Sequence, residues 1–244
     1  PKTAWPPTYV LEKRGGRLYG RGTADDKGAA VVALYCLKAL KDERVKCVRK
    51  ARAIFGAGEE IASDDLKQYF QREALPELAF TPDAEYGVCN REKGILHVEL
   101  SAPADGSRLE SLHGGTVRNA VAASARAEAR CTAEECEALE ALSKKMDGKF
   151  SFQGSGGVLT AECAGRAAHA MEPQKGRNAA ARLVRLFSSC FGGEALGALW
   201  SFVDQKIGLE LDGSSLGLRR EDAVSGPLTV NLGVAEQDNG VCRA

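Results

Sequence analysis

The chain has 244 residues, of which 44% are hydrophobic and 27% are charged, a composition typical of a folded globular protein and not of a disordered one. Its 33 basic and 33 acidic residues cancel, which argues against nucleic acid as a partner. The longest apolar run, residues 29–37, is too short to cross a bilayer, and no secretory signal is visible. Eight cysteines without CxxC spacing favour reduced thiols, so we expect a cytoplasmic protein without a membrane partner.

The first part of the chain alternates short apolar segments with longer helical stretches. The pattern predicts strands at residues 17–22, 50–55 and 76–80, with helices at 27–40 and 63–73. The helix at 27–40 is nearly all apolar, so we expect it to be buried. This β-α-β-α-β order predicts an α/β domain with a mostly parallel sheet between helices.

The helix at residues 63–73 carries its own start signal. Ser63 has the position of an N-cap, and Asp64 and Asp65 follow it at the positive end of the helix. We therefore assign these two aspartates to capping.

The pattern changes after about Gly94. Residues 95–102 alternate between apolar and polar side chains, which is typical of a strand with one wet face. Residues 125–133, 156–165 and 226–238 predict further strands, and 132–146 and 177–191 predict helices. The first of these helices begins with Thr132 and has Glu135 three residues on, the spacing of a capping box. We therefore expect two domains, residues 1–95 and an α+β unit at 96–244.

Carboxylates follow each predicted strand of the first domain. Asp25 follows the first strand, the adjacent Glu59 and Glu60 follow the second, and Asp83 follows the third. Ligands bind beyond the carboxyl ends of strands in open parallel sheets, so these side chains are expected to converge. Gathered carboxylates repel one another unless a cation neutralises them, and the pattern therefore favours a metal site.

Simpler interpretations stay open for each acid taken singly. Asp25 and Asp26 are also placed to cap the helix that follows them, the glutamate pair could be a solvated loop feature, and Pro-Asp at residues 82–83 is a common turn. If the site is real, one glutamate of the pair is suited to ligate a metal while the other takes the proton of an attacking water. An aspartate with two oxygens is suited to bridge two metal ions, the arrangement of two-metal hydrolases.

Several motifs, in order from Leu18 to about Ala181, resemble one enzyme family. They are "GRGTADDKG", "FGAGEE", "TPDAEYG", "GGTVRNAV" and "GRAAHAMEPQKGRNAA". This set resembles the dinuclear-zinc metallopeptidases that include aminoacylase, carboxypeptidase G, succinyl-diaminopimelate desuccinylase and Xaa-His dipeptidase. The sequences "YGRGTADDKG" and "TPDAEYG" are most similar to those of PepV-type dipeptidases.

The resemblance implies roles for the acids of the first domain. Asp25 would bridge two zinc ions, and its peptide bond to Asp26 would be cis. Glu59 would be the general base, while Glu60 and Asp83 would each ligate one zinc. Cobalt or manganese could take the place of zinc.

The second domain resembles the lid domain of this family. Asn119 and His169 would contact the substrate there, and His169 would donate toward the oxyanion of the tetrahedral intermediate. We interpret His97, on the wet face of a predicted strand, and His113, in a glycine-flanked loop, as structural.

The chain also departs from the family pattern. A His-X-Asp motif expected shortly before Pro1, and a zinc-binding histidine and a substrate-binding arginine expected beyond Ala244, are not in this sequence. We therefore expect a fragment whose catalytic and lid domains are both incomplete, and weak zinc binding by carboxylates alone.

The reading that the sequence favours is a zinc dipeptidase acting on a small peptide or an N-acyl amino acid. The alternatives are a truncated, catalytically inactive relative, a magnesium or manganese hydrolase that uses carboxylates alone, and a related deacylase or desuccinylase. A monomer and a lid-mediated homodimer are both compatible with the resemblance.

Overall fold

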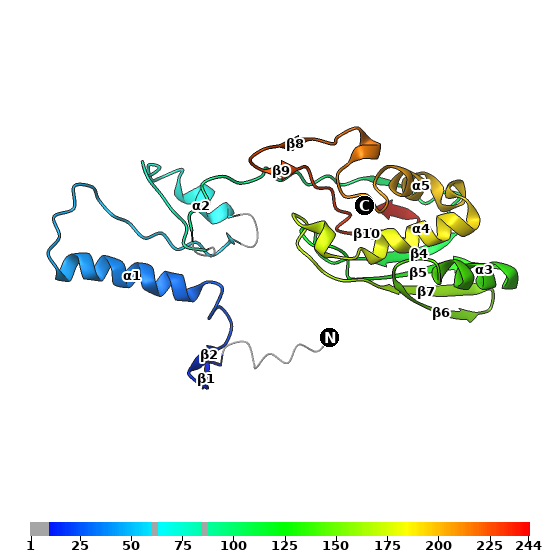
Figure 1. The fold of residues 1–244 in the computed structure, drawn as a ribbon, viewed down its shortest axis with the longest axis horizontal. Coiled ribbons are helices and arrows are strands. Elements are labelled where there is room, and N and C mark those ends of the chain that lie inside the picture. Colours follow the sequence, from blue (N-terminus) through cyan, green and yellow to red (C-terminus); the bar gives the residue numbers. More distant parts are fainter. Residues whose placement is uncertain (1–9, 60–62, 84–86) are drawn as a thin grey trace. The chain divides into compact units, whose positions relative to one another are not determined.

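The computed structural model describes residues 10–59, 63–83 and 87–244, which divide into two compact units, Pro1–Arg91 and Glu92–Ala244 (Figure 1). Each unit is described by itself. Among the helices of the described residues, none has the length and apolar character needed to cross a bilayer.

The first unit contains a hairpin and two helices. The hairpin pairs β1 (Glu12–Arg14) with β2 (Arg17–Tyr19) in antiparallel register. Its turn is formed by Gly15 and Gly16, whose φ angles of 56° and 74° are favoured by glycine. The helices are α1 (Lys27–Asp42) and α2 (Asp64–Tyr69).

The predicted parallel sheet of this unit is not formed by its described residues. Residues 50–55 and 76–80 are not strands, and every strand pair in the described parts of the chain is antiparallel. A parallel strand needs hydrogen-bonded neighbours and cover on both faces. Neither segment has them here, and Phe80 is 90% exposed.

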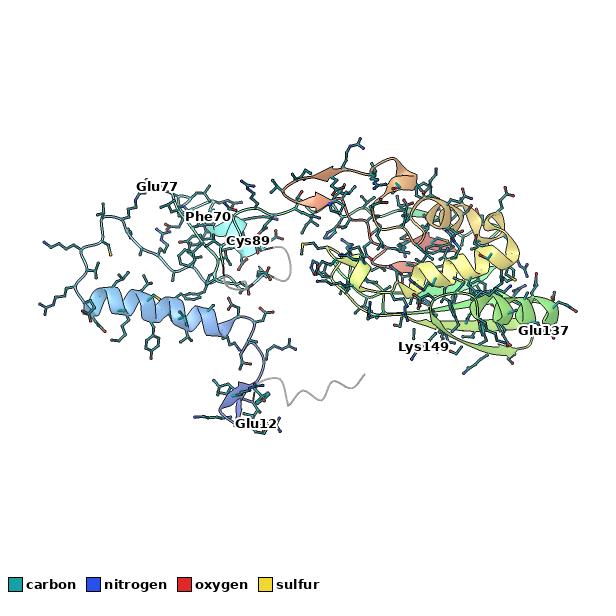
Figure 2. The ribbon with its side chains drawn as sticks, in the orientation of Figure 1. Glu12, Phe70, Glu77, Cys89, Glu137 and Lys149 are labelled. Atoms are coloured by element: carbon teal, nitrogen blue, oxygen red, sulfur yellow. The ribbon has the colours of Figure 1, made fainter. Side chains whose placement is uncertain are left out.

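The prediction of a helix at residues 27–40 is confirmed, but the prediction that this helix is buried is wrong. The helix α1 is present, but none of its residues is buried, and its side chains extend into solvent (Figure 2). Val32 and Tyr35 are among the exposed apolar residues. Composition predicted the burial, but burial also requires a surface that covers the helix.

The second unit is built on a seven-stranded antiparallel sheet with the order β3-β11-β10-β4-β5-β7-β6. Its strands are β3 (Ser101–Pro103), β4 (Leu109–Gly114), β5 (Ser124–Arg130), β6 (Lys149–Ser155), β7 (Val158–Ala164), β10 (Ala235–Asp238) and β11 (Val241–Arg243). A separate two-stranded pair joins β8 (Glu221–Asp222) to β9 (Gly226–Pro227).

Helices cover one face of this sheet (Figure 1). They are α3 (Ala133–Ser143), α4 (Ala179–Phe191) and α5 (Gly197–Lys206), with short 3₁₀ turns at Pro173–Lys175, Gly193–Leu196 and Ser214–Leu216. The helix α4 packs on β4, β5 and β7, with α3 and α5 beside it.

The strands at residues 125–133 and 156–165 and the helices at 132–146 and 177–191 are thus confirmed. The segments at 95–102 and 226–238 form strands only over Ser101–Pro103, Gly226–Pro227 and Ala235–Asp238.

Small residues set how closely α4 approaches the sheet. The inward positions of β5 are all alanines, including the buried Ala125, and the first turn of α4 presents the buried Ala180. Gly114, at the end of β4, lies between them: a methyl group there would be 2.6 Å from the Cβ of Ala180 and 3.0 Å from the Cβ of Ala125. Helix and sheet therefore meet almost backbone to backbone at this point.

The start of α3 has the predicted capping box. The Thr132 side chain accepts from the Glu135 amide at 3.3 Å, and the Glu135 carboxylate accepts from the Thr132 amide at 2.9 Å. Arg108 reaches the same carboxylate at 2.7 Å. The Arg108 hydrogen bond is the main cause that lowers the pKa of Glu135 to about 2.

By contrast, the predicted cap of α2 is only partly confirmed. Ser63 does occupy the N-cap position, but its φ is 52° and its side chain makes no capping hydrogen bond. Asp65, which we assigned to capping, instead accepts a hydrogen bond from the Ala57 amide of the preceding loop.

We predict that Gly114→Ala destabilises the second unit. The added methyl has no room between Ala125 and Ala180, and overpacking of this kind costs about 1–3 kcal/mol. Gly154→Ala is the matched control, because the nearest atom to an added Cβ is 3.9 Å away. Urea unfolding measures both variants, and equal stability of the two would contradict the close contact.

We also predict a pH-dependent loss of stability in Glu135→Gln. A carboxylate whose pKa is lowered on folding adds stability that is fully present above its ordinary pKa of 4.5 and is lost as the pH falls toward about 2. The urea midpoint of the variant should lie below that of the wild type at pH 7, and the gap should narrow from pH 4.5 downward. The exposed Glu137→Gln serves as control, and a gap that does not change with pH would contradict the Arg108–Glu135 interaction.

Candidate functional site

Asp25 lies in a tight turn between the hairpin and α1. The turn is closed by the Lys27 amide, which donates to the Gly22 carbonyl at 2.9 Å, while Lys27 Nζ donates to the Arg21 carbonyl at 3.0 Å. The Asp25–Asp26 peptide bond is cis, as the resemblance implies. Asp26 stands at the N-cap of α1 without a side-chain capping bond, so the capping interpretation finds no support here. Asp25 itself is exposed.

Glu59 ends the loop that follows residues 50–55. Its side chain is exposed, and the preceding Gly58 is buried. The Gly58 carbonyl accepts from the Ser63 amide at 2.7 Å. Glu60, the predicted metal ligand, lies outside the described residues.

Asp83 is described and exposed, but it is the last residue before the undescribed positions 84–86. Within the described ranges, no three His, Cys, Asp or Glu side chains form a group that could hold a metal ion. Asp25, Glu59 and Asp83 are therefore not brought together as such a group. The ligand set that includes Glu60 stays a prediction.

In the second unit, the structure places Asn119 and His169 next to each other. Ala120 and His169 form an isolated antiparallel bridge, and the Ala170 amide donates to the Asn119 carbonyl at 2.8 Å. Both side chains are exposed. Two segments that are distant in sequence thus present the two predicted substrate-binding residues at one place.

The hydrogen bonding of His169 defines its tautomer. Its Nδ1 accepts from the Met171 amide at 3.1 Å. A ring nitrogen that accepts carries no proton, so the proton of the neutral ring is on Nε2. In this tautomer Nε2–H is the donor of the exposed ring, and an oxyanion contact requires such a donor.

The turn that carries Asn119 is held by glycines. A methyl group on Gly233 would lie 2.5 Å from the Arg118 carbonyl oxygen, and one on Gly115 would lie 2.0 Å from the Gly233 carbonyl oxygen. Asn231 Nδ2 also donates to the Ala120 carbonyl at 2.9 Å. The turn geometry therefore depends on a segment more than a hundred residues away in sequence, which no local pattern reveals.

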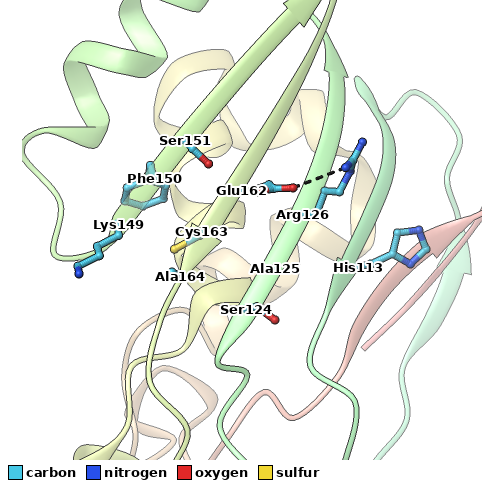
Figure 3. Close-up of a pocket in the computed structure, with 10 residues that line it drawn as sticks. All are labelled: His113, Ser124, Ala125, Arg126, Lys149, Phe150, Ser151, Glu162, Cys163 and Ala164. Carbon is cyan, nitrogen blue, oxygen red and sulfur yellow. Dashed lines mark ion pairs between the residues drawn. The ribbon is translucent and has the colours of Figure 1, made fainter. Parts of the chain in front are cut away.

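The open face of the sheet carries a depression of about 450 Å³ (Figure 3). Arg126 and Glu162 pair across it at 3.5 Å, and His113 lies at its rim. His113 belongs to β4, so its prediction as a loop residue is wrong. His97 likewise does not lie in a strand. None of the predicted site residues that the structure describes lines this depression.

Comparison with known proteins identifies the family. The profile of peptidase family M20/M25/M40 matches residues 1–195, which is most of the chain. The chain belongs to this family. The resemblance read from the motifs is thereby confirmed at the level of the family.

Two relatives of this M20 chain illustrate the match. It is 32% identical over 240 residues to "Putative dipeptidase YtjP" of Bacillus subtilis, covering 95% of this chain and 52% of that protein. It is 30% identical over 224 residues to "Beta-Ala-Xaa dipeptidase" of Lactobacillus delbrueckii subsp. lactis, covering 87% of this chain and 47% of that protein. The chain spans about half the length of the curated relatives it matches.

We predict that Gly233→Ala displaces the Asn119 turn of this M20 chain. The added methyl would meet backbone atoms of Arg118, which cannot rotate away as a side chain can. Amide chemical shifts of residues 118–121 and 168–170 should change, and stability should fall by about 1–3 kcal/mol. Gly94→Ala is the control, since no atom lies within 4 Å of its added Cβ. Unchanged shifts in the Gly233 variant would argue against a turn held by this contact.

Proposed function

We propose that the chain is part of a metal-dependent dipeptidase that hydrolyses the peptide bond of small substrates. One observation carries this proposal: the family match over residues 1–195 includes every predicted site residue. These residues are Asp25, Glu59, Glu60, Asp83, Asn119 and His169. Both relatives described above are named as dipeptidases, which supports a small peptide as substrate over an N-acyl amino acid.

We propose two zinc ions as cofactors, with cobalt or manganese as substitutes. Members of peptidase family M20 are generally metal-dependent. The donor chemistry of this chain fits a divalent cation, because Asp25 and Asp83 present exposed carboxylates. Asp25, Glu60 and Asp83 are the residues that would hold the metal ions, as the resemblance implies.

Each protein residue has a defined task in this proposal. Zinc, when bound, supplies Lewis acidity that acidifies water and polarises a carbonyl group. Glu59 takes the proton of the attacking water and later passes it to the leaving amine. His169 donates its Nε2–H to the developing oxyanion, and Asn119 orients the substrate. The support is the exposed carboxylate of Glu59 in the first unit and the Nδ1 contact of His169 in the second.

Two further features stay part of the proposal, a lid role for the second unit and a cytoplasmic location. The first follows from the family resemblance, and the second follows from the cysteine spacing.

We predict that Glu59→Gln abolishes dipeptide hydrolysis and leaves the zinc content unchanged. An amide cannot accept the proton of water, but it preserves the shape of the loop. Turnover of β-alanyl dipeptides with added zinc, together with metal analysis, tests this on the 244-residue chain and on the longest natural form of the protein. Glu12→Gln, at an exposed position of β1, is the control.

Retained turnover in the Glu59 variant would remove this residue as the base. No turnover by the wild type in either form would favour the inactive relative. Turnover with magnesium or manganese and none with zinc would favour the carboxylate-only hydrolase.

A further inference from the structure

Asp65, in the first turn of α2, is bonded to the loop that carries Glu59. Its Oδ2 accepts from the Ala57 amide at 2.6 Å, and its Oδ1 accepts from the Leu66 amide at 2.9 Å. The carboxylate thus joins the start of the helix to a backbone position two residues before Glu59. This contact crosses eight residues of sequence.

The glycine of the loop makes room for this carboxylate. A methyl group on Gly56 would lie 3.2 Å from Asp65 Oδ2 and 3.6 Å from Cγ of Leu66. A side chain at position 56 would therefore press on the carboxylate and on the leucine behind it. The absence of a side chain allows helix and loop to touch.

A second bond closes the same loop from the other side. The Ser63 amide donates to the Gly58 carbonyl at 2.7 Å, and Gly58 is buried. The backbone on the N-terminal side of Glu59 is therefore fixed at Ala57 and at Gly58. Among the described residues between Gly58 and α2, Glu59 is the exposed one.

The neighbouring aspartate makes a different contact. Asp64 Oδ1 pairs with Lys67 Nζ at 2.6 Å on the exposed side of α2. It carries the same charge in the same helical turn and therefore has the same favourable interaction with the helix dipole. Asp65 differs from it in reaching the loop.

We propose that Asp65 is a positioning residue for the general base. Its carboxylate fixes the backbone of the Gly56–Gly58 loop and thereby orients Glu59. The proposal rests on the proposed function, because it assigns Asp65 a role in the same reaction. Asp65 touches neither substrate nor metal in this account. It acts through Ala57 and Gly58.

The electrostatics of Asp65 agree with this role. The hydrogen bond from the Ala57 amide is the main cause that holds the pKa of Asp65 below its ordinary value. The side chain is therefore charged at neutral pH, and a charge-assisted bond to an amide is stronger than a neutral one. Small displacements of a catalytic group lower turnover steeply, by as much as about 100-fold for 1 Å.

The test compares Asp65→Ala with Asp64→Ala, which removes the same charge from the same turn without touching the loop. Asp65→Asn is the conservative variant, because its amide oxygen still accepts one hydrogen bond. Each variant is made in the longest natural form of the protein with zinc added. Two readouts are used: ¹⁵N relaxation of the amides of residues 57–59, and kcat and KM for a β-alanyl dipeptide.

We expect the amides of residues 57–59 to become more mobile in Asp65→Ala, with kcat lower by roughly 10- to 100-fold and KM within about twofold of the wild type. Asp65→Asn should recover part of kcat, and Asp64→Ala should change neither readout. A merely structural role of Asp65 would lower the stability of α2 without this separation of kcat from KM.

Unchanged relaxation in Asp65→Ala would overturn the anchor. A mobile loop with kcat kept within twofold of the wild type would overturn the positioning role while leaving Glu59 as base. Absence of turnover in the wild type would overturn the proposed function, and with it the catalytic role of Asp65. Inactive Glu59→Gln beside fully active Asp65→Ala therefore separates failure of this inference from failure of the proposed function.

Discussion

The close contact between α4 and the sheet positions the two segments of the second unit that carry Asn119 and His169. Ala180 meets Gly114 with no side chain between them. The chain leaves β4 at Gly114 to form the turn of Asn119, and it enters α4 through the segment that contains His169. Both segments are thus attached to the two sides of one tight contact, and the backbone bonds between them hold them in register. The apolar core thus positions the two predicted substrate-binding residues, Asn119 and His169, although both are exposed.

The first unit works by a different principle. None of the residues of α1 or α2 is buried, so packing cannot hold the loops in place. The contacts that order this unit are instead polar: Lys27 with the Asp25 turn, Asp65 with the Glu59 loop, and Arg52 with Glu73 at 2.9 Å. Such exposed bonds contribute little stability individually, but they select one backbone conformation among several.

How far the sequence predicts this structure depends on whether a signal is local. The capping box of Thr132 and the strand at residues 125–133 have signals that are complete within a few residues, and both predictions are confirmed. Residues 50–55 have the composition of a strand, but a strand also needs partners, and the described residues supply none. The cis bond at Asp25 came only from the family resemblance. The sequence predicts a capping role for Asp65, because a capping aspartate and one that binds a neighbouring loop have the same sequence context. Only the direction of the side chain separates them.

The glycines near the predicted site residues have physical roles. Gly56 admits the carboxylate of Asp65, Gly115 admits the Gly233 carbonyl, and Gly233 admits the backbone of Arg118 beside the Asn119 turn. In each case the residue proposed to do chemistry is exposed, whereas the small residue near it has little room around its Cα. These glycines therefore determine the positions of the proposed reactive groups, whereas the carboxylate and imidazole groups supply the proposed reactivity. A substitution of such a glycine would leave every proposed reactive group present and would still impair the proposed reaction, because displacing a catalytic group by about 1 Å can lower turnover by as much as about 100-fold.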